Sequence, residues 1–114
     1  MQAVAWADVG LLVKAIGTGF VFGSARAASS LPQAVGGMEN AQLVQAVVRG
    51  DAALSRLTFA QRVNAAAFYR GAAARTTGLL KEQTAAYNIA RARYLEGTGP
   101  APGRTIYDFM RNQG

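Results

Sequence analysis

The sequence predicts an all-α protein with one short N-terminal membrane helix, two or three alanine-rich helices and a flexible tail. Alanine makes up about a fifth of the 114 residues, and it has the highest helix propensity of all residues. No proline interrupts the chain between residues 33 and 99, so long helices are allowed there. Strands are not expected, because β-branched residues are few and apolar and polar residues do not alternate strictly.

The predicted membrane helix belongs to the first part of the chain, residues 1–28. Asp8 and Arg26 bracket a run of 17 residues, VGLLVKAIGTGFVFGSA, whose single charge is Lys14. A bilayer-spanning helix typically needs about 20 apolar residues, so this run is close to the required length. The Lys14 side chain can extend to the nearer membrane interface, where a residue such as Trp6 is also favoured. We therefore expect a membrane helix in this segment.

Small residues recur at every fourth position of this segment. A helix would place them on one face, and they are Ala15, Gly19, Gly23 and Ala27. In lipid, small side chains let two helix backbones approach closely, so this face predicts helix–helix packing. A glycine-rich turn in a soluble protein is one alternative, but it leaves the neighbouring large apolar residues without a core. A phosphate-binding loop is another, but it requires a strand and a βαβ unit that the sequence does not indicate.

The rest of the chain divides into three parts by composition. Residues 29–38 contain serine, proline and paired glycines, which predict a linker. Residues 39–96 form a basic, alanine-rich region in which we expect two or three helices, or one long bent helix. Residues 97–114 contain two prolines and four glycines, and they predict a flexible tail with at most one docking turn at residues 106–110.

Three local signals mark where helices begin within residues 39–96. Asn40 is expected to cap the first helix, and Gly50 with Asp51 to break the chain, with Asp51 capping the segment that follows. Thr58 and Gln61 match a capping box, in which each side chain binds the other residue's backbone N–H. The sequence therefore predicts a helix that begins after Thr58.

The residue types of the chain argue against an enzyme. Cysteine and histidine are absent, which removes thiolate chemistry, zinc–thiolate sites and the usual acid–base residue at neutral pH. The six carboxylates are scattered, and no two are spaced to share a helix face. Caps and surface ion pairs are the expected use of such residues. We therefore expect no catalytic residue, no metal site and no cofactor.

The charge is strongly basic and unevenly distributed. The formal net charge is +6, and from Arg26 onward there are 11 basic and 5 acidic side chains. Such an excess favours an anionic partner. The side chains expected to contact phospholipid head groups or an acidic partner are Lys14, Arg26, Arg49 and Arg56. Nucleic acid is disfavoured as the partner, because the arginines scatter around a helix axis and no known nucleic-acid-binding motif occurs.

The segment LLVKAIGTGFVFGSAR resembles the N-terminal segment of subunit e of mitochondrial ATP synthases. More broadly, the layout is similar to the small G-x-x-x-G subunits e and g of these complexes. The resemblance implies a non-enzymatic structural subunit of a respiratory-chain or ATP-synthase-type complex in the mitochondrial inner membrane, in contact with other subunits and with phospholipid. It also implies that Gly19 and Gly23 are the helix-contact glycines. The basic alanine–arginine region departs from this family.

A second resemblance leads elsewhere. The stretch RVNAAAFYRGAAARTTGLLKEQTAAYNIARARYL is similar in composition to internal virion proteins of tailed phages, which combine an apolar start with long helices. An internal or ejection-type structural protein of a virion is therefore the alternative function. A basic helical module that binds nucleic acid is the third.

Overall fold

The structure is a computed structural model that describes residues 28–113. Within this range the chain is helical and contains no strand, so the all-α prediction is confirmed there. The elements are α2 (Leu31–Val35), α3 (Met38–Val48), the 3-10 helix η1 (Leu54–Arg56), α4 (Phe59–Arg75), α5 (Lys81–Glu96) and α6 (Ile106–Gln113). The region predicted as two or three helices or one long bent helix forms three separate α-helices, α3 to α5.

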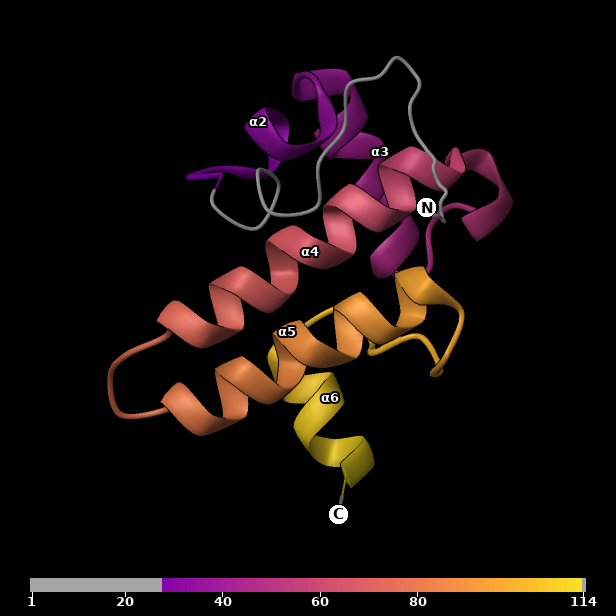
Figure 1. The fold of residues 1–114 in the computed structure, drawn as a ribbon. Coiled ribbons are helices and arrows are strands. Elements are labelled where there is room, and N and C mark those ends of the chain that lie inside the picture. The colour runs from indigo at the N-terminus through magenta and orange to yellow at the C-terminus, as the bar shows by residue number, and fades with distance from the viewer. Residues whose placement is uncertain (1–27, 114) are drawn as a thin grey trace.

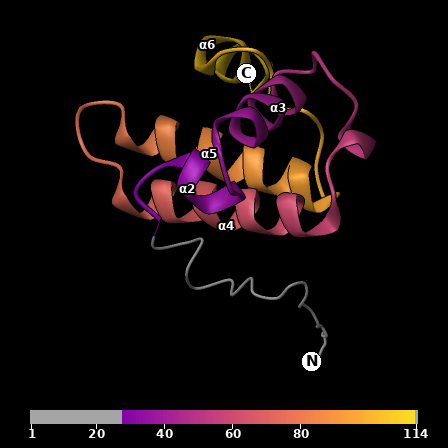
Figure 2. The same ribbon diagram turned by 90° about the horizontal axis from the view of Figure 1, so that it is seen from above.

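The two longest helices, α4 and α5, lie side by side and antiparallel as a hairpin (Figure 1). The α2–α3 pair covers this hairpin: α2 packs on α4, and α3 contacts both α4 and α5 (Figure 2). Helix α6 packs on α5. The core of the molecule therefore lies between the α4–α5 hairpin and the α2–α3 pair.

Helix α4 is the central element of this arrangement. Four consecutive residues, 64–67, are buried, and consecutive residues point about 100° apart around a helix axis. The middle of α4 is therefore covered on all sides. Three of the four residues are Ala65, Ala66 and Ala67. Their small side chains allow neighbouring helices to approach α4 closely, which explains why a chain so rich in alanine can form a packed core.

The predicted start of α4 is confirmed. The Thr58 side chain accepts a hydrogen bond from Gln61 N (3.1 Å), and Gln61 Oε1 accepts one from Thr58 N (2.8 Å). This reciprocal pair satisfies two backbone donors that the first turn of a helix leaves without partners.

Residues 29–38 are not only a linker, because they contain helix α2. Ser30 caps it by accepting a hydrogen bond from Gln33 N (3.3 Å), and Pro32 lies in its first turn. Gly36 ends it in the left-handed conformation, with φ 90°. Proline breaks a helix in its interior but is favoured in the first turn, and glycine is favoured just past the last turn, so these residues mark the two ends of α2. The buried side chains of α2 belong to the core: Leu31, Ala34 and Val35.

Two of the predicted caps are wrong. Helix α3 begins after Gly37, and Asn40 lies within its first turn, where its Nδ2 donates to Val35 O (2.9 Å). Asn40 therefore joins α3 to the end of α2. Gly50 and Asp51 do end the helix, but Asp51 does not cap the next one, since its carboxylate binds Arg49 and Arg104 instead.

Residues 106–113 of the predicted flexible tail form α6, a helix that begins where one docking turn was expected and continues beyond residue 110. Thr105 Oγ1 accepts a hydrogen bond from Asp108 N (3.1 Å) and so satisfies a donor in the first turn. Phe109 packs against Tyr87 of α5, with 5.6 Å between the ring centroids. The short helix is thus held by an aromatic contact that composition alone does not indicate.

Between residues 28 and 113, no helix combines the length and the apolar character needed to cross a bilayer. Apart from its last residue, the predicted membrane segment 1–28 lies outside the described part of the chain. The same is true of the predicted packing face, Ala15, Gly19, Gly23 and Ala27, and of Lys14 and Arg26.

Candidate interaction site

An arginine between two tyrosines joins the two hairpin helices. The guanidinium carbon of Arg91 on α5 lies 4.1 Å from the ring centroid of Tyr87 and 5.1 Å from that of Tyr69 on α4. Both tyrosines are buried. Arg91 Nη1 donates to Asn88 Oδ1 (3.2 Å), which orients the guanidinium, while its Nε is buried without a hydrogen-bond partner. A cation that lies over two aromatic faces and is partly removed from water interacts favourably with them, so this cluster of Arg91, Tyr69 and Tyr87 stabilises the hairpin.

The cluster continues to α6 through Tyr87. The Tyr87 hydroxyl donates to Gly103 O (3.1 Å) in the segment that leads to α6, and its ring contacts Phe109. Burial raises the pKa of the Tyr69 hydroxyl above its usual value of 10.0, although the positive charge of Arg91 opposes this shift. The aromatic residues therefore serve packing, and they leave no free stacking platform at these positions.

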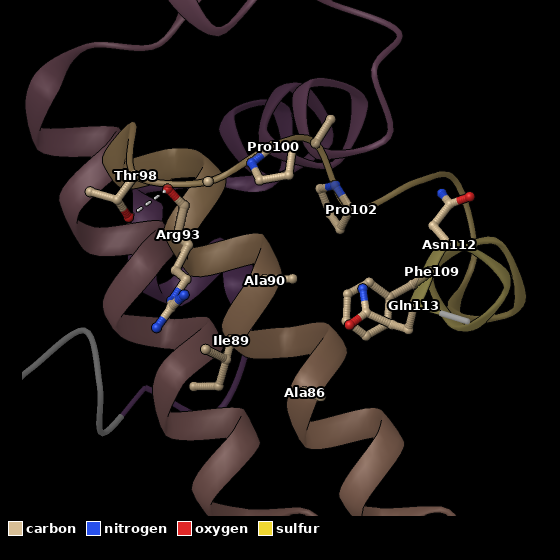
Figure 3. A pocket seen from close by; sticks show the side chains of 12 residues that line it. Ala86, Ile89, Ala90, Arg93, Thr98, Pro100, Pro102, Phe109, Asn112 and Gln113 are labelled. Atoms are coloured by element: carbon tan, nitrogen blue, oxygen red, sulfur yellow. Dashed lines mark hydrogen bonds between the residues drawn. The ribbon is translucent and has the colours of Figure 1, made fainter.

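A groove of about 660 Å³ lies beside this cluster, between α5, the proline-containing segment and α6 (Figure 3). Phe109 and Pro102 lie on one side of it and Ala90 of α5 on the other, while the Arg93 side chain extends away from Phe109. Asn112 and Gln113 supply amide groups at its α6 end. Among the described residues that line the groove, none carries a carboxylate. Its chemistry suits apolar contact with a few hydrogen bonds, and it provides no acid–base pair.

Most carboxylates of the described chain are bound to arginine. Glu96 forms a bidentate ion pair with Arg70, whose Nη2 donates to Oε1 (2.7 Å) and whose Nε donates to Oε2 (3.0 Å). These bonds raise the pKa of Arg70. Asp108 pairs with Arg111. Asp51 binds Arg104 and Arg49, and these bonds lower its pKa below the usual 3.8, with Arg104 the larger cause. Among residues 28–113, no three acidic side chains gather into a group that could hold a metal ion.

Comparisons of the chain with protein-family models, with curated proteins and with solved structures found no match.

The two described arginines that were expected to contact lipid or an acidic partner differ in their surroundings. Arg49 forms an ion pair within the chain, with 3.4 Å between its Nε and Asp51 Oδ2. Arg56 ends η1 and is exposed, which leaves it accessible to a partner. No pattern in the sequence predicts that an arginine of one helix binds a backbone carbonyl of another. Arg62 Nε donates to Leu95 O (2.7 Å), a contact between residues far apart in the chain that only the packing of α4 on α5 creates.

Proposed function

We propose that this chain is a non-enzymatic structural subunit of a larger membrane protein complex of the respiratory-chain or ATP-synthase type. Residues 9–25 anchor it as a short membrane helix, and the small-residue face of that helix packs against other subunits. The helical part from residue 28 to 113 lies at the membrane surface, in contact with neighbouring subunits and phospholipid head groups. The mitochondrial inner membrane is the proposed location.

The observation that carries this proposal is the run of 17 residues between Asp8 and Arg26, which holds one charge and a regular series of small residues. A second feature supports the structural role. Three of the five carboxylates from residue 28 onward are engaged by arginines, in pairs that link neighbouring or distant parts of the chain. Acidic side chains held in this way contribute to folding, and they are poorly placed for acid–base chemistry.

The basic surplus supports contact with an anionic surface. Asp51, Glu96 and Asp108 form ion pairs with arginines, which leaves Glu39 and Glu82 as the exposed acidic residues of the described chain outside these pairs. The exposed basic residues outside these pairs are more numerous, and they include Arg56, Lys81 and Arg93. Anionic head groups attract basic segments by about 1 kcal/mol per residue near the surface.

Alkaline carbonate extraction of membranes from cells that express the full chain tests the proposal. We expect the chain to stay in the membrane pellet after both carbonate and high salt. Ile16→Glu places a charge in the middle of the apolar run and should release the chain, whereas Gln45→Glu on the exposed side of α3 should not. Release of the unaltered chain by carbonate would contradict a membrane anchor and favour the virion alternative.

A further inference from the structure

The turn between α4 and α5 exposes two leucines. We define the hairpin tip as residues 76–80, the segment between the end of α4 and the start of α5. Gly78 reverses the chain with φ 104°, and its carbonyl accepts a hydrogen bond from Lys81 N (3.2 Å). Leu79 is fully exposed, at 102 %, and Leu80 is 47 % exposed. Their side chains therefore point away from the core.

The position of Leu80 makes this exposure unusual. Leu80 is the N-cap residue of α5 and makes no side-chain cap, although serine, threonine, aspartate and asparagine are strongly preferred there. Leu79 contributes no packing that would compensate for its contact with water. The tip thus carries two adjacent apolar residues where local structure alone would favour polar ones, and an apolar environment outside the chain would remove both from water.

The charged residues beside the tip indicate which kind of surface the two leucines contact. Arg75 in the last turn of α4 and Lys81 at the start of α5 flank the two leucines, and both side chains are exposed. Glu82, next to Lys81, is also exposed, so residues 75–82 carry two basic side chains and one acidic one. Leucines between basic residues match the interface of an anionic bilayer, where apolar groups enter the acyl boundary and cations meet phosphate.

The tip also lies toward the end of the molecule where the predicted membrane segment would join. The start of the described chain, which leads into α2, and the α4–α5 turn lie toward the same end of the hairpin in both views (Figures 1 and 2). A bilayer at this end could accept both parts. We propose that the hairpin tip inserts Leu79 and Leu80 into an anionic bilayer, as a second membrane contact of the chain; this inference rests on the membrane location proposed above.

The absence of cysteine makes a site-specific test possible. Thr77→Cys places a polarity-sensitive fluorophore at the tip without altering the leucines, and Gln45→Cys places it on the exposed side of α3 as a control. The labelled full chain is reconstituted into vesicles of phosphatidylcholine and phosphatidylglycerol that contain a lipid-borne quencher. We expect quenching of the probe at position 77 and none at position 45.

A double variant, Leu79→Ser with Leu80→Ser, provides the decisive comparison. Both side chains are exposed, so circular dichroism should show unchanged helix content. We expect the ratio of lipid-embedded to water-exposed tips to fall about tenfold or more, because transfer of one leucine side chain from water into lipid favours the embedded state by about this factor. Vesicles without phosphatidylglycerol should reduce the quenching several-fold, and equal quenching there would overturn the preference for anionic lipid.

The same experiment separates the two proposals. A chain that floats with the vesicles while the probe at position 77 stays unquenched overturns the inference and leaves the membrane anchor intact. A chain that does not float at all contradicts the proposed function as well.

Discussion

Arg91 illustrates, at the scale of one residue, how this basic chain uses its charges. The net charge of +6 predicted an anionic partner, but it could not indicate which arginines would bind inside the molecule. Arg91 lies between Tyr69 and Tyr87, and Arg62 and Arg70 bind groups near the end of α5. These contacts join residues more than 20 positions apart, except for the one between Arg91 and Tyr87. They depend on the register of two packed helices, which no local sequence pattern reports.

Arg91→Gln should destabilise the fold by about 1–2 kcal/mol, because it removes a partly buried cation from two aromatic faces. Urea unfolding followed by circular dichroism measures this change. The matched control is Arg93→Gln, an exposed arginine on the same helix, which should change the free energy of unfolding by no more than about 0.5 kcal/mol. Equal losses in the two variants would show that the stack contributes nothing.

Tyr69 predicts a dependence on alkaline pH. Its pKa is raised in the folded state, so the folded chain holds this proton more tightly than the unfolded chain does. Both states keep the proton below about pH 10, and above it the unfolded state loses the proton first, so stability falls as pH rises. Tyr69→Phe keeps the ring and removes the hydroxyl. The quantity to follow is the free energy of unfolding of the variant minus that of the unaltered chain. This difference should be constant at neutral pH and rise above about pH 10. A difference that stays constant at all pH values would contradict the prediction.

Among the elements, the sequence predicts a helix start correctly where the cap is made within a few residues, as at Thr58 and Gln61, but not at Asn40 or Asp51, whose side chains bind groups outside the helix start. The Thr58–Gln61 capping box is a local pattern, and it forms as expected. Helix α2 is not predicted, because Pro32 and the glycines after Val35 are typical of a linker; in the structure they occupy the first turn and the end of a helix. For α6 the sequence predicts at most one docking turn at residues 106–110 and not the full helix, because the support of α6, the contact of Phe109 with Tyr87, comes from another element.

The central position of α4 could not be predicted either, because alanine suits an exposed helix as well as a buried one. Ala66→Leu should therefore be a sensitive test of it. Ala66 is 2 % exposed in a part of α4 that is covered on all sides, so three added carbons must displace a neighbouring helix. We expect a loss of about 2 kcal/mol in the free energy of unfolding. Ala74→Leu, at an exposed position of the same helix, should have little effect, and similar losses at both positions would argue against close packing around α4.

At the scale of the whole molecule, the sequence predicted an all-α chain, and residues 28–113 confirm it. It did not predict the groove or the exposed leucines of the hairpin tip. The groove is formed by α5, the proline-containing segment and α6 together. Nothing in the sequence around Leu79 and Leu80 distinguishes exposed leucines from buried ones. Such surfaces arise only when elements meet, and they are where the described part of the chain can bind a partner.

If the chain is a structural subunit held in a larger complex by a membrane helix, the yield of that complex in mild detergent should depend on the small-residue face of the helix. Membranes that carry the unaltered chain, Gly23→Leu or Leu12→Phe are solubilised, and the chain is followed by native electrophoresis. We predict that the unaltered chain migrates in a large assembly. Gly23→Leu should lower the yield of this assembly at least several-fold, since a bulky side chain separates helix backbones that must approach closely, whereas Leu12→Phe on the neighbouring face should not. Migration of the unaltered chain by itself, or equal yields from the two variants, would contradict the claim.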